Sequence, residues 1–304
     1  MVELETLSRC LLCGSEAIEL VDPECNIARC RDCEYVFDNP RPTLPELVKF
    51  YSGMSKYDSW LDEIELREVM WKRRLKLVLP FRKPGSLLDI GAGIGQFLSV
   101  ARPYYEKTYG TEVSTSAIQI AKKKYGVDLF QGTIEEFARS GKVFDNISLI
   151  HVLEHVPDPV KVIRLCHSLL SDDGVLVVAV PNDVACLRHW KRRKLVAAGF
   201  RKPYPGAGQF CIQPIRLTDQ KGEVHLSHFT PRVLANLLRR LGFEVIKNTP
   251  DPHYLGLKQV RKLREHIYYN FCVGIEKVFG TNLYDTMLTI AKKKSSTRDQ
   301  RMAA

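Results

Sequence analysis

Three glycines that follow one short apolar segment constrain this chain most strongly. The segment SLLDI, residues 86–90, reads as a buried strand, and Gly91, Gly93 and Gly95 come directly after it. A helix is expected from residue 96 onward. A glycine-rich turn between a strand and a helix lets the backbone approach a ligand closely. The stretch LLDIGAGIGQFL therefore predicts a ligand-binding loop in an α/β fold, although dinucleotide-binding loops have the same pattern.

Strand and helix patterns alternate after this loop. A second strand ends at Glu112, twenty-one residues beyond Gly91, and further strands are expected at 127–130, 144–150 and 175–180. Such alternation predicts a doubly wound, mostly parallel sheet, whose ligands lie beyond the carboxyl ends of the strands. The candidate residues at those ends are Gly91, Glu112, Thr133, His151 and Asn182.

Cysteines near the N-terminus have the spacing of a metal site. The chain has nine cysteines, and five of them lie in its first 33 residues. Two C-x-x-C pairs can each offer two thiolates to one ion, and four thiolates form a tetrahedral site that suits zinc. The alternative, four unrelated buried cysteines, is disfavoured by this spacing. Cys25 has no partner at such a spacing and is left out. We predict a structural Zn²⁺ site formed by Cys10, Cys13, Cys30 and Cys33.

Charge and hydropathy limit the partners and the compartment. The 304 residues carry a formal net charge of +10, and residues 188–202 contain seven Lys or Arg and no acid. This basic run is either a solvated surface or a contact for an acidic surface or substrate. Apolar runs are far shorter than the roughly 20 residues needed to cross a bilayer, and the first residues have no signal-peptide pattern. We expect a cytoplasmic protein without a transmembrane segment.

Five stretches together resemble the successive motifs of class I S-adenosylmethionine-dependent methyltransferases of the small-molecule type. They are LLDIGAGIGQFL, GTEVSTSAIQIAKK, FDNISLIHVLEHVPDPVKVI, GVLVVAVPN and HLSHFTPRVLANLLRRLGFEV. The cysteine segment is similar to a zinc-binding leader in part of that group, and TMLTIAKK resembles the terminal antiparallel strand. The resemblance implies a Rossmann-like, seven-stranded methyltransferase domain over residues 46–294, behind a zinc module and linker over residues 1–45.

The same resemblance implies the cofactor and the residues that hold it. S-adenosylmethionine would lie along the strand ends, with Glu112 on its ribose and His151 beside its reactive methyl group. The family often has an acid where this chain has Thr133, so a backbone contact to the adenine is expected there. The implied cofactor-binding residues are Asp89, Gly91, Ala92, Gly93, Glu112, Thr133, Ile134 and His151.

Histidines are the candidate bases for an acceptor that must lose a proton. His151 and His155 are four residues apart, and a second pair, His225 and His228, precedes a helix expected to start at Pro231. Capping and core packing are the alternative roles for these side chains. HVLEH lacks the longer helix of the HExxH zinc motif, so no metal is assigned to it. The candidate catalytic residues are His151, His155 and His225.

Two segments depart from the regular α/β pattern. Residues 182–224 contain the basic run and are expected to form an acceptor-side insert. Residues 257–280 have apolar positions at helical spacing with Lys and Arg between them, which predicts an amphipathic helix. This helix either packs on its own domain or makes peripheral contact with an anionic membrane. Residues 295–304 are expected to be a disordered tail.

The predicted function is methyl transfer to a small-molecule or lipid-linked acceptor. The basic insert suggests an acidic acceptor, such as a sugar, glycolipid or natural-product intermediate. The alternative is an RNA methyltransferase whose zinc module contacts RNA, but an NPPY-type tetrapeptide is absent and the cysteine segment lacks aromatic residues interleaved with basic ones. A non-catalytic binding module is disfavoured by the intact glycines and Glu112. A dehydrogenase is disfavoured by HVLEHVPDP and GTEVS.

Overall fold

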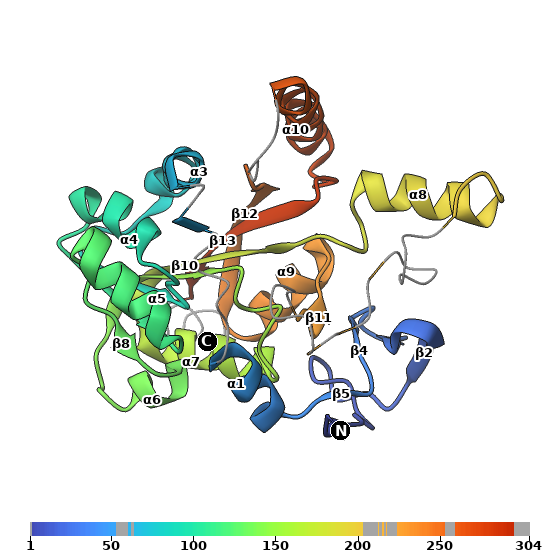
Figure 1. Cartoon of the computed structure of the whole chain (residues 1–304), viewed down its shortest axis with the longest axis horizontal. Helices are drawn as coiled ribbons and strands as arrows, with labels where there is room; N and C mark the ends of the chain where they lie inside the picture. Colours follow the sequence, from blue (N-terminus) through green and yellow to red (C-terminus); the bar gives the residue numbers. More distant parts are fainter. Residues whose placement is uncertain are drawn as a thin grey trace, which may run out of the picture.

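A seven-stranded sheet forms the centre of the computed structural model (Figure 1), which describes residues 2–52, 60–61, 64–202, 212, 215, 217, 224–252 and 259–294. The strand order is β12-β13-β10-β9-β6-β7-β8. The strands are β6 (Ser86–Ile90), β7 (Lys107–Glu112), β8 (Phe130–Gln131), β9 (Phe144–Ile150), β10 (Leu170–Pro181), β12 (Phe243–Pro250) and β13 (Thr286–Lys293).

The pairing confirms the predicted mostly parallel sheet. β8, β7, β6, β9 and β10 pair in parallel with one another, whereas β13 lies antiparallel between β10 and β12. The antiparallel strand occupies the stretch TMLTIAKK, as predicted. Five consecutive residues of β13 are buried, so this strand has the apolar run of a strand that is covered on both faces.

Helices cover both faces of this sheet. One core joins α6 (Ile134–Ala138), α7 (Pro159–Leu169) and α9 (Pro231–Arg240) to one face. A second core joins α3 (Ile64–Val78) and α4 (Gln96–Ala101) to the other face. Alternate residues of each strand enter alternate cores, as the period of two requires: Leu88, Leu176 and Val178 lie in the first core, and Leu87, Val175 and Val177 lie in the second.

Side-chain caps fix the helix starts near the carboxyl edge of the sheet. Ser114 accepts a hydrogen bond from the Ala117 backbone N–H at the start of α5 (Thr115–Ile120), and Thr230 accepts one from Val233 at the start of α9. These caps satisfy backbone donors that have no partner inside the helix. The loops that precede both helices are thereby held in place.

The N-terminal segment forms a small sheet with a strand from far along the chain. The order is β11-β4-β3-β2, where β2 is Ile18–Asp22, β3 is Ile27–Cys30, β4 is Val36–Asp38 and β11 is Ser227–His228. The Tyr35 hydroxyl lies 2.6 Å from Ser227 Oγ. A two-stranded pair, β1 (Leu4–Glu5) with β5 (Arg41–Pro42), and α1 (Leu44–Ser52) complete the segment. It therefore shares backbone hydrogen bonds with the stretch that carries His225 and His228.

Two further helices project from the layered body in Figure 1: α8 (Leu187–Ala197) and α10 (Gln259–Phe279). α10 contacts the end of β12, where its Tyr269 hydroxyl donates to the Pro250 carbonyl. Among the described residues, no helix combines the length and the apolar character that a membrane span requires. Most of the predicted insert after residue 202, and the predicted tail over residues 295–304, lie outside the described residues.

Candidate active site

The glycine loop after β6 has a backbone that other residues adopt only with strain. Gly91 has a φ of +67°, and a Cβ added to it would lie 2.6 Å from Val152 Cγ2. Gly95 has a φ of +71° and begins α4. A Cβ at Gly91 would therefore need both a left-handed backbone and movement of Val152, which explains a glycine at this position.

Asp89 is a buried carboxyl at the carboxyl end of β6. It accepts a hydrogen bond of 2.6 Å from Ser148 Oγ. Burial raises the pKa of Asp89 to about 7, and the nearby charge of Glu112 acts in the same direction. A cationic ligand group at this end of the strand would favour the ionised form.

Glu112 connects the glycine loop to the end of β7. Its Oε2 accepts a hydrogen bond from the Gly93 backbone N–H at 2.8 Å. Its Oε1 accepts from the backbone N–H groups of Val113 and Ser114 at 2.8 and 2.9 Å. These three donors fix the orientation of the Glu112 carboxylate at the end of β7.

Thr133 and Ile134 lie at the start of α6, beside the end of β8. Thr133 Oγ1 accepts from the Glu136 N–H, while the Thr133 N–H donates to Glu136 Oε2 at 2.7 Å. The Thr133 carbonyl accepts the helical hydrogen bond of Phe137. The capping box thus already uses the polar groups of Thr133, and the buried Ile134 contributes apolar surface.

His151 is held in an unusual conformation at the end of β9. Its φ is +55°. Its Nδ1 lies 3.2 Å from Glu154 Oε1, and its Nε2 lies 2.8 Å from an Arg74 guanidinium nitrogen and 3.6 Å from Asp251 Oδ2. Burial lowers the pKa of His151, but hydrogen bonding to Asp251 and Glu154 outweighs this and the net shift is upward. These contacts hold the ring in a fixed position. Because a guanidinium nitrogen only donates, the Arg74 contact at 2.8 Å uses the lone pair of His151 Nε2.

Glu154 and His155 face the same side of the site. The Glu154 side chain is 1% exposed, and its Oε1 lies 3.8 Å from His155 Nε2. His155 Nδ1 lies 2.6 Å from the Val224 carbonyl oxygen and 3.1 Å from the Tyr51 hydroxyl. Because a carbonyl only accepts, His155 Nδ1 carries the proton.

The second histidine pair lies against the end of β10 and the N-terminal sheet. The ring of His225 meets that of His155 edge to face, with centroids 5.0 Å apart, and His225 Nδ1 lies 3.7 Å from Asp183 Oδ2. His228 is buried and lies 2.9 Å from Asp38 Oδ2. The structure thus brings His151, His155 and His225 to one region, whereas the contact with Asp38 ties His228 to β4.

Several polar residues of this region have no local sequence signal. Asp251 and Arg74 are 177 residues apart and form a buried ion pair, while Asp183 reaches the histidines from the end of β10. Glu154 could have been found, because it lies between two candidate histidines. Asn182 is instead structural: its side-chain amide donates to the carbonyls of Asn282 and Tyr284.

The four predicted zinc ligands converge. Their sulfur atoms all lie within 4.8 Å of one another, and the Sγ pairs Cys10–Cys33 and Cys13–Cys30 are each 3.5 Å apart. Tetrahedral zinc with bonds of about 2.3 Å separates sulfur atoms by about 3.8 Å. The spacing and the thiolate chemistry both fit a zinc ion.

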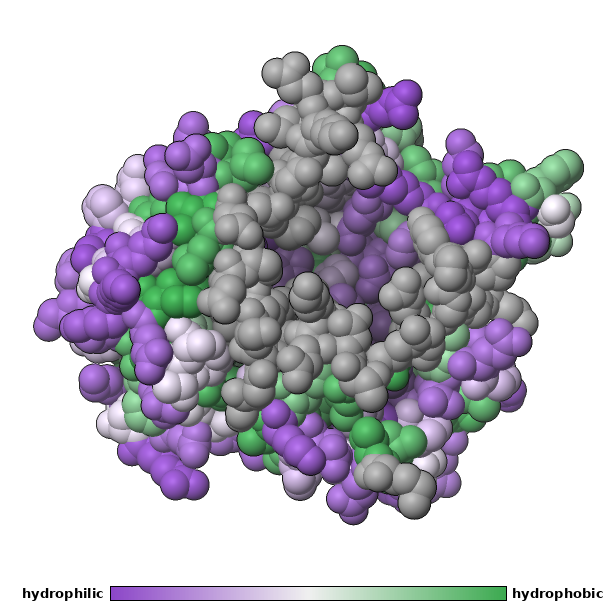
Figure 2. All heavy atoms as spheres, in the orientation of Figure 1, coloured by the Kyte–Doolittle hydropathy of each residue, from purple (hydrophilic) through white to green (hydrophobic). Residues whose placement is uncertain are grey.

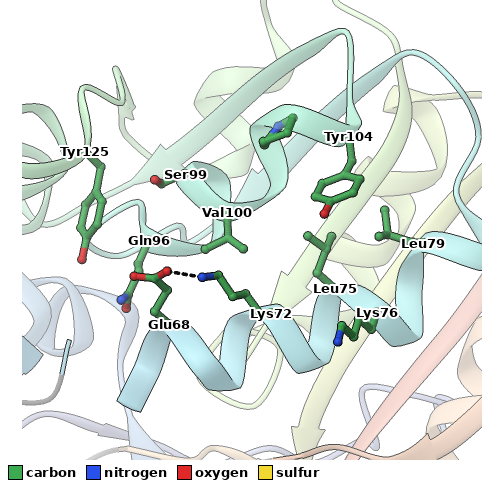
Figure 3. Close-up of a pocket in the computed structure, with 11 residues that line it drawn as sticks. Glu68, Lys72, Leu75, Lys76, Leu79, Gln96, Ser99, Val100, Tyr104 and Tyr125 are labelled. Carbon is green, nitrogen blue, oxygen red and sulfur yellow. Dashed lines mark ion pairs between the residues drawn. The ribbon is translucent and has the colours of Figure 1, made fainter. Parts of the chain in front are cut away.

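A surface groove of about 440 Å³ lies elsewhere, between α3 and α4 (Figure 3). It runs along α4 from Gln96 and Tyr125 at one end to Tyr104 and Leu79 at the other. None of the predicted cofactor-binding or catalytic residues lines it. The buried polar cluster, rather than this groove, is the candidate active site.

Comparison with known proteins identifies the family of this chain. Residues 63–248 match a family described as a methyltransferase domain. A ubiquinone biosynthesis O-methyltransferase of Actinobacillus pleuropneumoniae is 36% identical over 108 residues, which cover 32% of this chain and 46% of the relative. The chain thus spans about half the length of the curated relatives it matches.

Two solved structures share the fold at low sequence identity. A chain from Listeria monocytogenes, assigned to the S-adenosylmethionine dependent methyltransferases, is 17% identical with a TM-score of 0.51, covering 76% of this chain and all of that one. The plantazolicin methyltransferase, solved with a triazolic desmethylPZN analogue and SAH, is 16% identical with a TM-score of 0.50, covering 83% of this chain and 96% of that one.

Proposed function

Since this chain belongs to the methyltransferase-domain family, we propose that it transfers a methyl group from S-adenosylmethionine to a small-molecule or lipid-linked acceptor. The observation that carries the proposal is the coupling of the glycine loop to Glu112 through the Gly93 N–H. This hydrogen bond holds the Glu112 carboxylate next to a glycine loop whose backbone a ligand can approach closely. Both lie at the carboxyl ends of parallel strands, where such folds bind nucleoside ligands.

The residues present fit this cofactor. In the proposed arrangement Asp89, Gly91, Ala92 and Gly93 border its methionine part. The oriented carboxylate of Glu112 receives a hydroxyl of the ribose. Ile134 packs against the adenine beside Thr133, and His151 lies next to the reactive centre. When bound, S-adenosylmethionine supplies an electrophilic methyl group on a sulfonium.

The chain's own contribution is positioning and exclusion of water. Arg74, Asp251 and Glu154 hold the His151 ring in place. In the proposal its imidazole is therefore a fixed polar surface of the site and does not act as a mobile base. His155 and His225 lie on the acceptor side of Glu154. Their ring nitrogens are the candidate proton acceptors for an acceptor group that is protonated before attack.

The N-terminal segment is proposed to be a structural zinc module. Four thiolates leave no open position on a tetrahedral ion, as in other structural sites. Zinc binding would stabilise the small sheet in which β4 pairs with β11. It would thereby help to position His225 on the acceptor side.

An acidic or lipid-linked acceptor is the finer part of the proposal. The sequence of α8 contains five Lys or Arg and no acid, and hydrophilic side chains gather over α8 in Figure 2. On α10 the side chains of Leu263, Ile267 and Phe271 are 63%, 62% and 53% exposed. Arg188 links the two helices through an ion pair with Glu265. A basic helix beside an exposed apolar stripe suits an anionic lipid surface.

Transfer of labelled methyl groups tests the proposal. The protein is incubated with methyl-labelled S-adenosylmethionine and an extract of its host, and label is counted in RNA, protein, lipid-glycan and small-metabolite fractions. Label in lipid-glycan or small metabolites, absent with Glu112→Ala, is the expected result. Label in RNA would favour the alternative, in which the zinc module and basic helix contact RNA.

A further inference from the structure

We propose that Glu154, His155 and His225 bind a divalent cation on the acceptor side of the site, an inference that rests on the proposed function. Each residue offers one ligand atom, and these atoms all lie within 4.8 Å of one another. The set is separate from the four cysteines. It joins the end of β9 to the segment before β11, so no local sequence motif contains it.

Glu154 provides the clearest sign of a missing partner. Its side chain is 1% exposed, and its Oε2 has no hydrogen-bond partner among the described residues. A buried carboxylate oxygen without a partner is costly, because it has lost its water and gained nothing in return. A cation bound to this carboxylate beside His155 and His225 would compensate its buried charge.

His155 is oriented as a metal ligand. Its Nδ1–H donates to the Val224 carbonyl, so Nε2 carries the lone pair and lies 3.8 Å from Glu154 Oε1. Metal-binding histidines usually donate their other N–H to a carbonyl or carboxylate in this way. The Tyr51 hydroxyl donates to the same Val224 carbonyl at 3.2 Å, which further fixes that acceptor.

His225 has the corresponding arrangement with a carboxylate. Its Nδ1 lies 3.7 Å from Asp183 Oδ2, and its ring contacts that of His155. A carboxylate behind a ligand histidine sets the tautomer and raises the basicity of the nitrogen that binds metal. Asp183 is therefore a positioning residue for His225.

Two imidazole nitrogens and one carboxylate oxygen favour a transition-metal ion such as Zn²⁺, Co²⁺ or Mn²⁺ over Ca²⁺. Ligands of a tetrahedral ion with bonds of about 2.1 Å lie about 3.4 Å apart, so the side chains need only move inward slightly. Three protein ligands leave coordination positions open. An open position beside the methyl donor would take a hydroxyl oxygen of the acceptor and lower its pKa.

The proposal therefore names the acceptor group as a hydroxyl and gives His155 and His225 the role of ligands and not of bases. In the transfer, the hydroxyl proton passes to water and the oxygen forms a bond to the methyl carbon. The carbon–sulfur bond breaks and its electron pair stays on sulfur. The products are a methyl ether, the thioether form of the cofactor and one proton.

Titration with Co²⁺ tests the site. The protein is first brought to one zinc per chain by dialysis against a chelator, so that the cysteines are occupied. Co²⁺ is then added, and the visible ligand-field absorption is followed together with binding heat. We expect one Co²⁺ per chain without a thiolate charge-transfer band, and affinity at least tenfold weaker in Glu154→Gln, His155→Gln and His225→Gln.

Matched variants keep this test falsifiable. His167→Gln and Glu135→Gln change the same residue types outside the cluster and should leave Co²⁺ affinity unchanged. Cofactor affinity and zinc content verify that each variant is folded, and the partly exposed His225 offers a mild substitution if Glu154→Gln fails. Absence of Co²⁺ binding by the wild type, or unchanged affinity in folded His225→Gln, overturns the proposal. Retained cofactor binding in that case leaves the proposed function standing.

Discussion

Arg74 and Asp251, 177 residues apart in the chain, form a fully buried ion pair, and the same guanidinium reaches His151 Nε2 at 2.8 Å. The pair joins α3 to the end of β12. Arg74 Nε donates to Asp251 Oδ1 at 2.6 Å, and a second guanidinium nitrogen donates to Oδ2. Two buried charges thus hold the histidine at the end of β9.

Removing Asp251 should be strongly destabilising. Asp251→Ala leaves the Arg74 guanidinium buried without its carboxylate, and such losses cost roughly 3–5 kcal/mol of unfolding free energy. Denaturant unfolding measures the loss. Asp128→Ala, which removes an exposed ion pair with Lys122, should cost less than about 1 kcal/mol. Equal losses of unfolding free energy in the two variants would show that the buried ion pair contributes no more to stability than the exposed one.

Replacement of Glu112 should weaken cofactor binding. Glu112→Gln removes the negative charge that accepts the hydrogen bond of the Gly93 N–H and that is proposed to bind the ribose. We expect at least tenfold weaker binding of S-adenosylmethionine by calorimetry, which corresponds to about 1.4 kcal/mol. Glu106→Gln, at an exposed position before β7, is the matched control. Near wild-type affinity in Glu112→Gln would contradict the ribose assignment.

One tightly held zinc per chain is expected from the four cysteines. Cys30→Ser removes a buried ligand and should abolish that zinc and expose the small sheet to proteolysis, because modules of this size fold with their metal. Cys272→Ser, a buried cysteine of α10, should retain it. Metal analysis of freshly purified protein decides the matter, and a wild type without zinc would refute the assignment.

Regular alternation explains why the central fold was predictable from sequence. Most residues of β6 and β9 are buried, β10 contains the continuous apolar run VLVVAV, and the last strand in the chain is the predicted stretch TMLTIAKK. A helix start can be predicted from neighbouring residues alone where a Ser or Thr precedes a segment with helical apolar spacing. These signals are local, so one sequence is sufficient.

The polar cluster was only partly predictable, for a physical reason. Gly91 and Glu112 stand at strand ends, where a local pattern marks them. The contacts of His225 with Asp183, of His228 with Asp38 and of Arg74 with Asp251 join distant segments. Spacing along the chain carries no information about such pairs. The pairing of β4 with β11 was missed for the same reason.

Stability without ligands should depend on pH through Asp89. Burial raises its pKa from 3.8 to about 7 in the folded protein. The folded state therefore binds the proton more tightly than the unfolded state, and stability present at low pH is lost as pH rises from about 4 to about 7. Denaturant unfolding at pH 5 and pH 8 should show wild type losing stability relative to Asp89→Asn. A difference that is the same at both pH values would contradict this shift.

The α8–α10 surface should bind anionic vesicles. Its exposed apolar side chains, Leu263, Ile267 and Phe271, lie at helical spacing on one face of α10, and α8 supplies positive charge. Sedimentation with vesicles that contain phosphatidylglycerol should retain the wild type, whereas neutral phosphatidylcholine vesicles should not. Lys191→Glu with Lys194→Glu should weaken binding by more than tenfold, because each basic residue near such a surface contributes about 1 kcal/mol.

The apolar part of that surface is tested separately. Ile267→Ser with Phe271→Ser removes two exposed side chains from the apolar stripe of α10 and should reduce vesicle binding even at low salt, where charge attraction is strongest. Val69→Ser, which alters an equally exposed apolar residue on α3, should bind as the wild type does. If wild type and both double variants sediment alike, α8 and α10 do not form a lipid-binding surface, and an acceptor in free solution becomes the better interpretation of the basic helix.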